Sequence, residues 1–218
     1  MKHLRTMAII MMAVLMVLPV WVLAEEEGTS SKDTFEQNTL FKSGKVTHGG
    51  FGAPIVKIST IKNRGRVLVG GRGAWLINHK WTIGGGGYGV ASDMTGNVSG
   101  TNRRFHMGYG GFEIGYICKP ASLFHMRFIN LIGAGGIGYS RNKDDDCDCD
   151  WDFHDRYRAD SFFVLEPSLS LELNIVKWMR MSLGAGYRYV NGVDNVPDFK
   201  SEDLSGPSIE LNLTFGKF

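Results

Sequence analysis

The amino-acid sequence predicts an all-β protein, an eight-stranded antiparallel up-and-down β-barrel. Apolar residues alternate with small or polar ones in eight segments, and after the first hairpin the links between the segments alternate between short and long. The last segment has a strict period of two, with Ile209, Leu211, Leu213 and Phe215 on one face. Successive residues of a strand point to opposite faces, so each segment has an apolar and a polar face. This pattern is typical of a closed barrel with two unlike ends.

The eight segments are separated by residues that favour turns. The expected strands are 50–62, 66–77, 80–91, 105–118, 123–140, 161–176, 178–190 and 206–218. The links between them are 63–65, 78–79, 92–104, 119–122, 141–160, 177 and 191–205. Asn and Gly residues in the links mark the ends of the first two strands. Glycine runs weaken the alternation of apolar and polar residues in the next three. The sixth and seventh alternate clearly, through Leu169 and Leu171 and through Met181 and Leu183.

The lengths of the links give the barrel two different ends. Three of the four links at one end are long, at 92–104, 141–160 and 191–205, whereas all three at the other end are short. We call these the long-loop end and the short-turn end. An even number of strands places both ends of the barrel segment at the short-turn end. The link 63–65 is short and departs from this habit.

The first 24 residues have the pattern of a cleaved secretory signal. Lys2 and Arg5 precede an apolar run that ends at Ala24, before three glutamates. A retained anchor helix is the alternative. Residues 25–49 are polar and are expected to form a flexible periplasmic segment, with the barrel at 50–218. Without Lys2 and Arg5 the chain has 22 basic and 22 acidic residues, a balance that indicates no nucleic-acid partner.

Aromatic residues are concentrated near both ends of the expected strands. Near the short-turn end are Trp75, Trp81, Phe124, Trp178, Phe215 and Phe218, and near the long-loop end are Tyr88, Phe105, Tyr109, Tyr139, Phe162, Phe163, Tyr187 and Tyr189. Two aromatic belts around an apolar band are typical of the two interfaces of a membrane, although aromatic caps on a soluble core give the same local pattern. Trp178 and Tyr189 have opposite parity, which requires a bulge or an inward-facing ring.

Charged residues occupy the strand face opposite to the apolar one. They are Lys57, Arg66, Arg72, Glu113, Arg127, Glu166, Glu172, Arg180, Arg188 and Glu210. A basic side chain that faces lipid near the bilayer midplane costs about 2–4 kcal/mol, so in a transmembrane barrel these side chains are expected to face inward. An eight-stranded barrel is only wide enough for side chains to fill it. Opposite charges are therefore expected to pair and fill the lumen.

Taken together, the signal-like segment, the eight segments, the aromatic belts and Phe218 resemble the small outer-membrane β-barrel proteins of Gram-negative bacteria. The glycine-rich stretches 49–54, 69–73 and 83–88 resemble one lineage of these barrels, and none of these motifs implies an activity. In that family a terminal aromatic residue is a recognition signal for the barrel-assembly machinery. The resemblance implies this role for Phe218, although Gly216 stands where a second large residue is common.

The link 141–160 contains eight aspartates. Carboxylates at alternate positions suit a hard cation such as Ca²⁺, and the weak candidates for ligands are Asp146, Asp148, Asp150 and Asp152. Their spacing lacks the turn glycine and closing glutamate of a helix–loop–helix calcium site, so a solvated acidic loop is the simpler interpretation. Cys147 and Cys149, with His154 nearby, form an incomplete zinc set. No cofactor is expected.

The sequence therefore predicts a monomeric protein of the cell outer membrane with a structural or surface-interaction role, carried by the loops 92–104, 141–160 and 191–205. The expected partners are outer-membrane lipids, the barrel-assembly machinery, and an extracellular ligand or divalent cation at the acidic loop. Three alternatives remain open: a narrow channel for small polar solutes, a secreted soluble barrel that binds a hydrophobic ligand, and a lipid-modifying enzyme. The enzyme would use His79, His106 or His125, but no serine stands in a nucleophile setting beside His79 or His125.

Overall fold

The computed structural model describes residues 46–92, 94–98, 101–140, 159–194, 196 and 199–218. Within these residues the chain forms strands and one short helix. In order, the elements are β1 (His48–Ile61), β2 (Arg64–Ile77), β3 (Trp81–Val90), β4 (Met94–Val98), β5 (Thr101–Cys118), β6 (Phe124–Ser140), β7 (Ala159–Val176), β8 (Met179–Asn191), α2 (Ser201–Leu204) and β9 (Gly206–Lys217). No helix in these ranges is long and apolar enough to cross a membrane.

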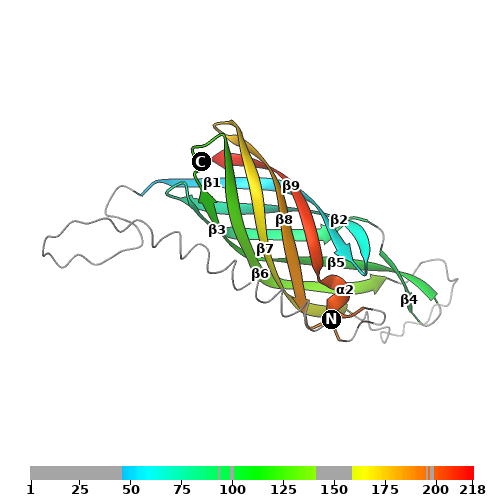
Figure 1. Cartoon of the computed structure of the whole chain (residues 1–218). Helices are drawn as coiled ribbons and strands as arrows, with labels where there is room; N and C mark the ends of the chain where they lie inside the picture. The colour runs from blue at the N-terminus through cyan, green and yellow to red at the C-terminus, as the bar shows by residue number, and fades with distance from the viewer. Residues whose placement is uncertain (1–45, 93, 99–100, 141–158, 195, 197–198) are drawn as a thin grey trace, which may run out of the picture. The chain divides into compact units, whose positions relative to one another are not determined.

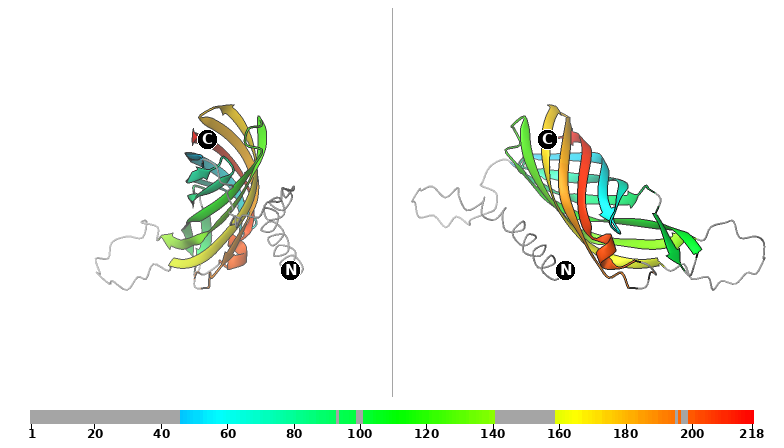
Figure 2. Two further views of the ribbon diagram at one scale, coloured as in Figure 1. Left: turned by 90° about the vertical axis from the view of Figure 1, so that its left-hand side faces the viewer. Right: turned by 45° about the vertical axis from the view of Figure 1, so that its right-hand side comes forward.

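Eight of the strands form a closed antiparallel barrel (Figure 1). Neighbouring strands pair in sequence order, β3 pairs with β5, and β9 returns to β1. Following Cα partners once around the barrel from Gly49 leads back to β1 at Ser59, an offset of ten residues (59 − 49). This stagger requires the strands to tilt against the barrel axis, as Figure 2 shows. The prediction of an eight-stranded antiparallel barrel is confirmed, and the strand ends differ by only a few residues.

The prediction that 92–104 is a loop is wrong. Strand β4 pairs with the first residues of β5, from Met94 opposite Phe105 to Val98 opposite Thr101. The hairpin therefore continues past the point where β3 leaves the barrel. Threonine and valine favour extended backbone, and they lie on both sides of the hairpin turn, at Thr95, Val98 and Thr101.

Trp178 and Tyr189 share the outer face although they have opposite parity. The register between β7 and β8 shifts between Asn174 and Val176. Trp178 lies in the turn that follows, and both Trp178 and Tyr189 are exposed on the outer wall. The extra residue, Ile175, lies in β7 and not between Trp178 and Tyr189. The two rings share one face because Trp178 belongs to the turn, where the alternation of a strand does not apply.

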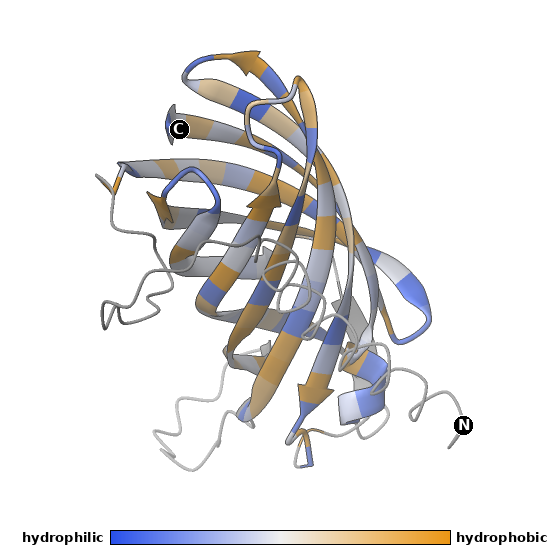
Figure 3. Cartoon of the chain, turned by 60° about the vertical axis from the view of Figure 1, so that its left-hand side comes forward, coloured by the Kyte–Doolittle hydropathy of each residue, from blue (hydrophilic) through white to orange (hydrophobic). Residues whose placement is uncertain are grey.

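The apolar face of the barrel points outward and the charged face points inward. Leu183, Ile209 and Ile58 are 57–60% exposed, whereas Arg127 and Glu172 are at most 1% exposed. Colouring by hydropathy shows apolar and polar positions alternating along the strands (Figure 3). The soluble-carrier alternative requires the apolar face to line the interior, so this arrangement contradicts it.

The link between β8 and β9 folds over the long-loop end of the barrel. Val193, Val196, Phe199 and Leu204 are buried in an apolar cluster with residues of the barrel wall such as Phe105. The rings of Phe199 and Phe105 lie 4.6 Å apart. Helix α2, which carries Leu204, lies at the end of the barrel opposite to the C-terminus (Figure 1). We call residues 192–205 the cap.

The cap is also held by hydrogen bonds. Arg188 Nε donates to the carbonyl oxygen of Leu204 (2.8 Å). The backbone N–H of Lys62 donates to the carbonyl oxygen of Asp203 (2.7 Å). The N–H of Val193 donates to Ser201 Oγ (3.0 Å). The expectation that 191–205 is a mobile surface loop is therefore wrong for this link, because its apolar side chains cover the mouth.

We predict that Phe199→Ala loosens the cap. Truncation of a buried phenylalanine typically costs about 3–5 kcal/mol, and here the loss falls on the contact that anchors 192–205. The variant should be cleaved by trypsin after Lys200 much faster than the wild type, in detergent micelles. Phe215→Ala, the same truncation on the outer wall, is the control. Equal cleavage rates for Phe199→Ala and the wild type would contradict this account of the cap.

Candidate functional site

The lumen of the barrel is the candidate functional site, because it gathers nearly all the charged residues expected to face inward. Nine of these ten are buried, and the tenth, Arg66, is half-buried near the long-loop end. The nine are Lys57, Arg72, Glu113, Arg127, Glu166, Glu172, Arg180, Arg188 and Glu210. They come from β1, β2, β5, β6, β7, β8 and β9, so the cluster exists only when the barrel is closed.

Arg72 is the centre of the first group. Its Nη1 and Nη2 donate to the two carboxylate oxygens of Glu210, at 3.3 and 3.2 Å. Its Nε lies 3.1 Å from Glu113 Oε2. Nη2 also donates to the hydroxyl of Tyr88 (2.8 Å), which in turn donates to Glu113 Oε1 (3.0 Å). A two-pronged guanidinium–carboxylate pair fixes orientation as well as charge, so this group is rigid.

Lys57 links the first group to a second carboxylate. Its ammonium donates to Glu166 Oε1 (3.0 Å) and lies 3.6 Å from Glu210 Oε2. It also lies 3.9 Å from the centre of the Tyr88 ring, a cation–π contact. Glu166 accepts two further hydrogen bonds, from Tyr109 OH (2.7 Å) and Ser208 Oγ (2.9 Å). The middle of the lumen is thus one connected network.

Glu172 is the centre of a separate group nearer the short-turn end. Its two oxygens lie 2.8 Å from Arg127 Nη2 and 2.9 Å from His125 Nε2, and Arg180 Nη1 lies 3.8 Å away. The guanidinium of Arg180 stacks 3.8 Å from the ring of Phe218. One carboxylate therefore serves two arginines and a histidine.

Small residues make room for these large side chains. A Cβ atom on Gly86 would lie 2.5 Å from a carboxylate oxygen of Glu113 and 3.2 Å from the hydroxyl of Tyr88. The inward glycine of β3 thus lets Glu113 and Tyr88 meet across two strands. This explains why the glycine run 84–87 interrupts the alternation without interrupting the strand.

The charges of the lumen are almost balanced. Five buried lysine and arginine side chains face four buried glutamates. Arg188 donates to the carbonyl oxygens of Leu204 and Thr60. Buried charges persist only when paired and hydrogen-bonded. The ion pairs and hydrogen bonds described above supply such partners within the lumen.

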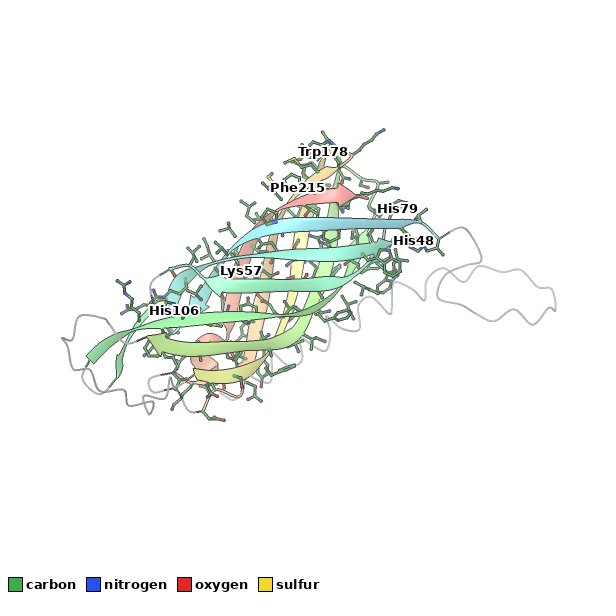
Figure 4. The ribbon with its side chains drawn as sticks, turned by 180° about the vertical axis from the view of Figure 1, so that it is seen from behind. His48, Lys57, His79, His106, Trp178 and Phe215 are labelled. Carbon is green, nitrogen blue, oxygen red and sulfur yellow. The ribbon has the colours of Figure 1, made fainter. Side chains whose placement is uncertain are left out.

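The aromatic belt at the short-turn end lies on the outer wall. Trp75, Phe124, Trp178 and Phe215 are exposed, and Trp81 is half-buried against Tyr116 at a ring distance of 4.9 Å. Figure 4 shows Trp178 and Phe215 at the same end as His79. Of the other belt, Tyr189 and Phe163 are exposed and Tyr187 is partly exposed.

The assignment of Tyr88, Phe105, Tyr109 and Phe162 to the long-loop belt is wrong. These four side chains are at most 5% exposed and point into the lumen. Their parity shows why: Tyr109 is four residues from Glu113, and an even spacing along a strand keeps two side chains on one face. The alternation of charges, more than the position near a loop, was the signal that would have placed them.

The three histidines considered for an enzyme lie in different parts of the barrel. His125 is inside the lumen, bonded to Glu172, while His79 and His106 are exposed near opposite ends of the barrel (Figure 4). The metal candidates Asp146, Asp148, Asp150 and Asp152, with Cys147 and Cys149, lie outside the described residues. Among the residues that are described, no group of three or more His, Cys, Asp or Glu side chains is placed to hold a metal.

Comparison with solved structures identifies the architecture. Neisserial surface protein A (NspA) aligns with 80% of this chain and 100% of its own, with a TM-score of 0.50 and 11% sequence identity. The N-terminal β-barrel domain of Pseudomonas aeruginosa OprF gives a TM-score of 0.47 at 8% identity, over 77% of this chain and 96% of that chain. Ail, the attachment invasion locus protein of Yersinia pestis, gives 0.48 at 10% identity, over 78% and 97%.

The chain has the fold of a small eight-stranded outer-membrane β-barrel. No protein-family model matches its sequence, and no match is found among curated proteins. At 11% identity the likeness to NspA establishes the fold alone. The function must therefore be argued from the residues of this chain.

We predict that Glu172→Gln destabilises the barrel strongly. The change leaves Arg127, Arg180 and His125 buried around a neutral side chain, and breaking a buried pair from one side typically costs about 3–5 kcal/mol. The measurement is the midpoint of urea unfolding in detergent micelles. Glu202→Gln, the same change at an exposed position of α2, should have little effect. The double variant Glu172→Leu/Arg127→Met should recover part of the loss, and an unfolding midpoint for Glu172→Gln equal to that of the wild type would refute the pairing.

Proposed function

We propose that this protein is a monomeric outer-membrane β-barrel with a structural or surface-interaction role. The single observation that carries the proposal is the burial pattern of the wall: nine charged side chains of the strands are buried, whereas large apolar side chains of the same strands, such as Ile58, Leu183 and Ile209, are exposed. In water such a surface would be unstable and adhesive, because large apolar patches are rare on soluble monomers. In lipid the same surface is solvated, and closure pairs each of the eight barrel strands on both sides.

The two ends of the wall support an orientation in the membrane. Exposed aromatic side chains at both ends suit the two interfaces, where a ring buries its body and keeps its polar part wet. Outer-membrane barrels have short periplasmic turns and longer external loops. On this basis the turns at 78–80, 119–123 and 177–178 face the periplasm, and the cap faces outward.

The long-loop end is the proposed surface for interaction. It contains the β4–β5 hairpin and the cap, and it is where β6 ends and β7 begins, on either side of the acidic segment 141–158 in the sequence; that segment lies outside the described residues. These correspond to the loops 92–104, 141–160 and 191–205, with a ligand or divalent cation at the acidic loop as a candidate partner. The rigid wall supports these segments, as loops on a rigid scaffold commonly carry binding functions.

Phe218 is the proposed signal for the barrel-assembly machinery; its ring lies 6.2 Å from Phe51 and under Arg180, inside the short-turn mouth. Because the lumen is filled by the ionic networks and covered by the cap, we do not assign it a transport role. Because the histidines are separated, we do not assign the protein an enzymatic one.

Cell fractionation tests the membrane location. The folded protein should stay with the outer membrane and change its gel mobility on boiling. Recovery as a water-soluble monomer in the periplasm would overturn the proposal. In planar bilayers the wild-type protein should give no discrete conductance steps, and reproducible steps would replace the structural role with a narrow channel.

We predict that a charge on the outer wall is tolerated according to its depth. Leu183 and Leu123 are both 60% exposed, but Leu183 lies within β8 and Leu123 lies in the short turn before β6. Leu183→Arg should destabilise the protein in lipid bilayers by about 2–4 kcal/mol, and Leu123→Arg by about 0–1 kcal/mol. The measurement is the urea midpoint in phospholipid vesicles. Equal effects of the two changes would argue against a membrane-spanning wall.

A further inference from the structure

The short-turn end of the barrel carries an exposed lysine at every turn. Lys80 lies in the β2–β3 turn, Lys119 in the β5–β6 turn and Lys177 in the β7–β8 turn, and Lys217 ends β9. All four are exposed. In the described part of these turns there is no aspartate or glutamate, and Glu172 of the same end faces the lumen. We call these four residues the lysine ring.

The lysine ring surrounds the barrel and does not form a patch on one side. The order of the strands is β3-β2-β1-β9-β8-β7-β6-β5, so the three turns and the end of β9 lie at successive positions around the circumference. A protein or polymer that docks on one side would contact only part of such a ring. A surrounding bilayer contacts all of it.

Each lysine is accompanied by an aromatic side chain of the short-turn belt. Trp81 follows Lys80, Trp178 follows Lys177, and Phe215 lies two residues before Lys217. The exposed Phe124 follows the turn that contains Lys119. Long basic side chains reach from an apolar wall to the headgroup region while their aliphatic stems stay in contact with the wall. The ring is therefore placed at the depth of the lipid headgroups.

The opposite end of the barrel does not share this excess of positive charge. There the exposed basic residues, such as Arg64, Arg104 and Lys200, are mixed with acidic ones such as Asp194 and Glu202. The acidic segment 141–158 joins the same end in the sequence. The charge asymmetry is thus a property of the short-turn rim.

We propose that the lysine ring binds the anionic phosphate headgroups of phospholipids in the leaflet that surrounds the short-turn end. This inference rests on the proposed function, because the rim meets headgroups only if the wall spans a membrane. The ring selects phosphatidylglycerol-type lipids over zwitterionic ones by adding an attractive charge at each turn, and this attraction weakens as salt screens it.

The test uses the full-length protein refolded into phosphatidylcholine bilayers that contain a low fraction of brominated lipid. Bromine quenches nearby tryptophans, and Trp81 and Trp178 stand beside two of the lysines, so quenching by brominated phosphatidylglycerol relative to brominated phosphatidylcholine gives a relative binding constant. We expect a preference for phosphatidylglycerol of about fivefold, the factor that one lysine adds at an anionic surface. The preference should fall toward one at about 0.5 M NaCl, where the screening length is only a few ångströms.

The variant Lys80→Gln/Lys119→Gln/Lys177→Gln should lose most of this preference. The control Arg64→Gln/Arg104→Gln/Lys200→Gln removes the same number of positive charges at the other end and should keep it. Equal loss of the lipid preference in both variants, or no lipid preference in the wild type, would overturn the proposal. The proposal would also be overturned if the lysine variant kept its lipid preference but no longer co-sedimented with purified peptidoglycan, because the ring would then bind peptidoglycan. If the lysine variant does not fold, the salt titration of the wild type decides alone. If brominated phosphatidylcholine did not quench the tryptophans either, the protein would not be in the bilayer and the proposed membrane location would be wrong. This result differs from a failure of the lysine ring alone, in which both lipids would quench equally.

Discussion

The structure depends on the pairing of buried cations and carboxylates inside a sheet whose outer face is apolar. Arg72 and Lys57 contact carboxylates from strands that are distant in sequence, and Glu172 contacts groups from both of its neighbours, β6 and β8, so no pair of neighbouring strands contains a complete network. A partly assembled sheet would leave charges without partners in a medium of low dielectric, which is far more costly than leaving them in water. The ionic lumen therefore makes closure of the barrel an all-or-none event and fixes its register.

Tyrosine is the residue that connects charge to packing in this lumen. Tyr88 and Tyr109 lie 5.3 Å apart, ring to ring, and each carries a hydroxyl that bonds a glutamate while its ring packs in the apolar cluster below the cap. The interior thus changes from ionic to apolar along the axis, and the two hydroxyl groups lie at the boundary. Arg188 completes this boundary, because it lies over the Tyr109 ring and donates to the backbone of α2.

The alternation of residues along the strands was sufficient to predict much of this architecture. The predictions failed where the residues do not alternate, or where the alternation was not applied. Charged residues at even spacing, such as Glu166, Glu172 and Arg180 with Arg188, predicted one inward face, and the same rule applied to Tyr88 or Tyr109 would have placed those rings correctly. The cap was missed because Val193, Val196 and Phe199 follow neither strand nor helix periodicity; their burial depends on a mouth that only the assembled barrel provides. The pairing partners within the lumen were also beyond the sequence, since they depend on the ten-residue stagger around the barrel.

The cap has a consequence for the medium that the ionic interior experiences. Its apolar cluster separates Arg188 and the carboxylates beneath it from the long-loop side, whereas the group around Glu172 approaches the short-turn mouth, behind the rings of Phe51 and Phe218. In the orientation proposed here, apolar side chains close the external mouth, and the ionic group around Glu172 lies toward the periplasmic rim. The two mouths of one barrel thus differ in chemistry, apolar on one side and ionic on the other.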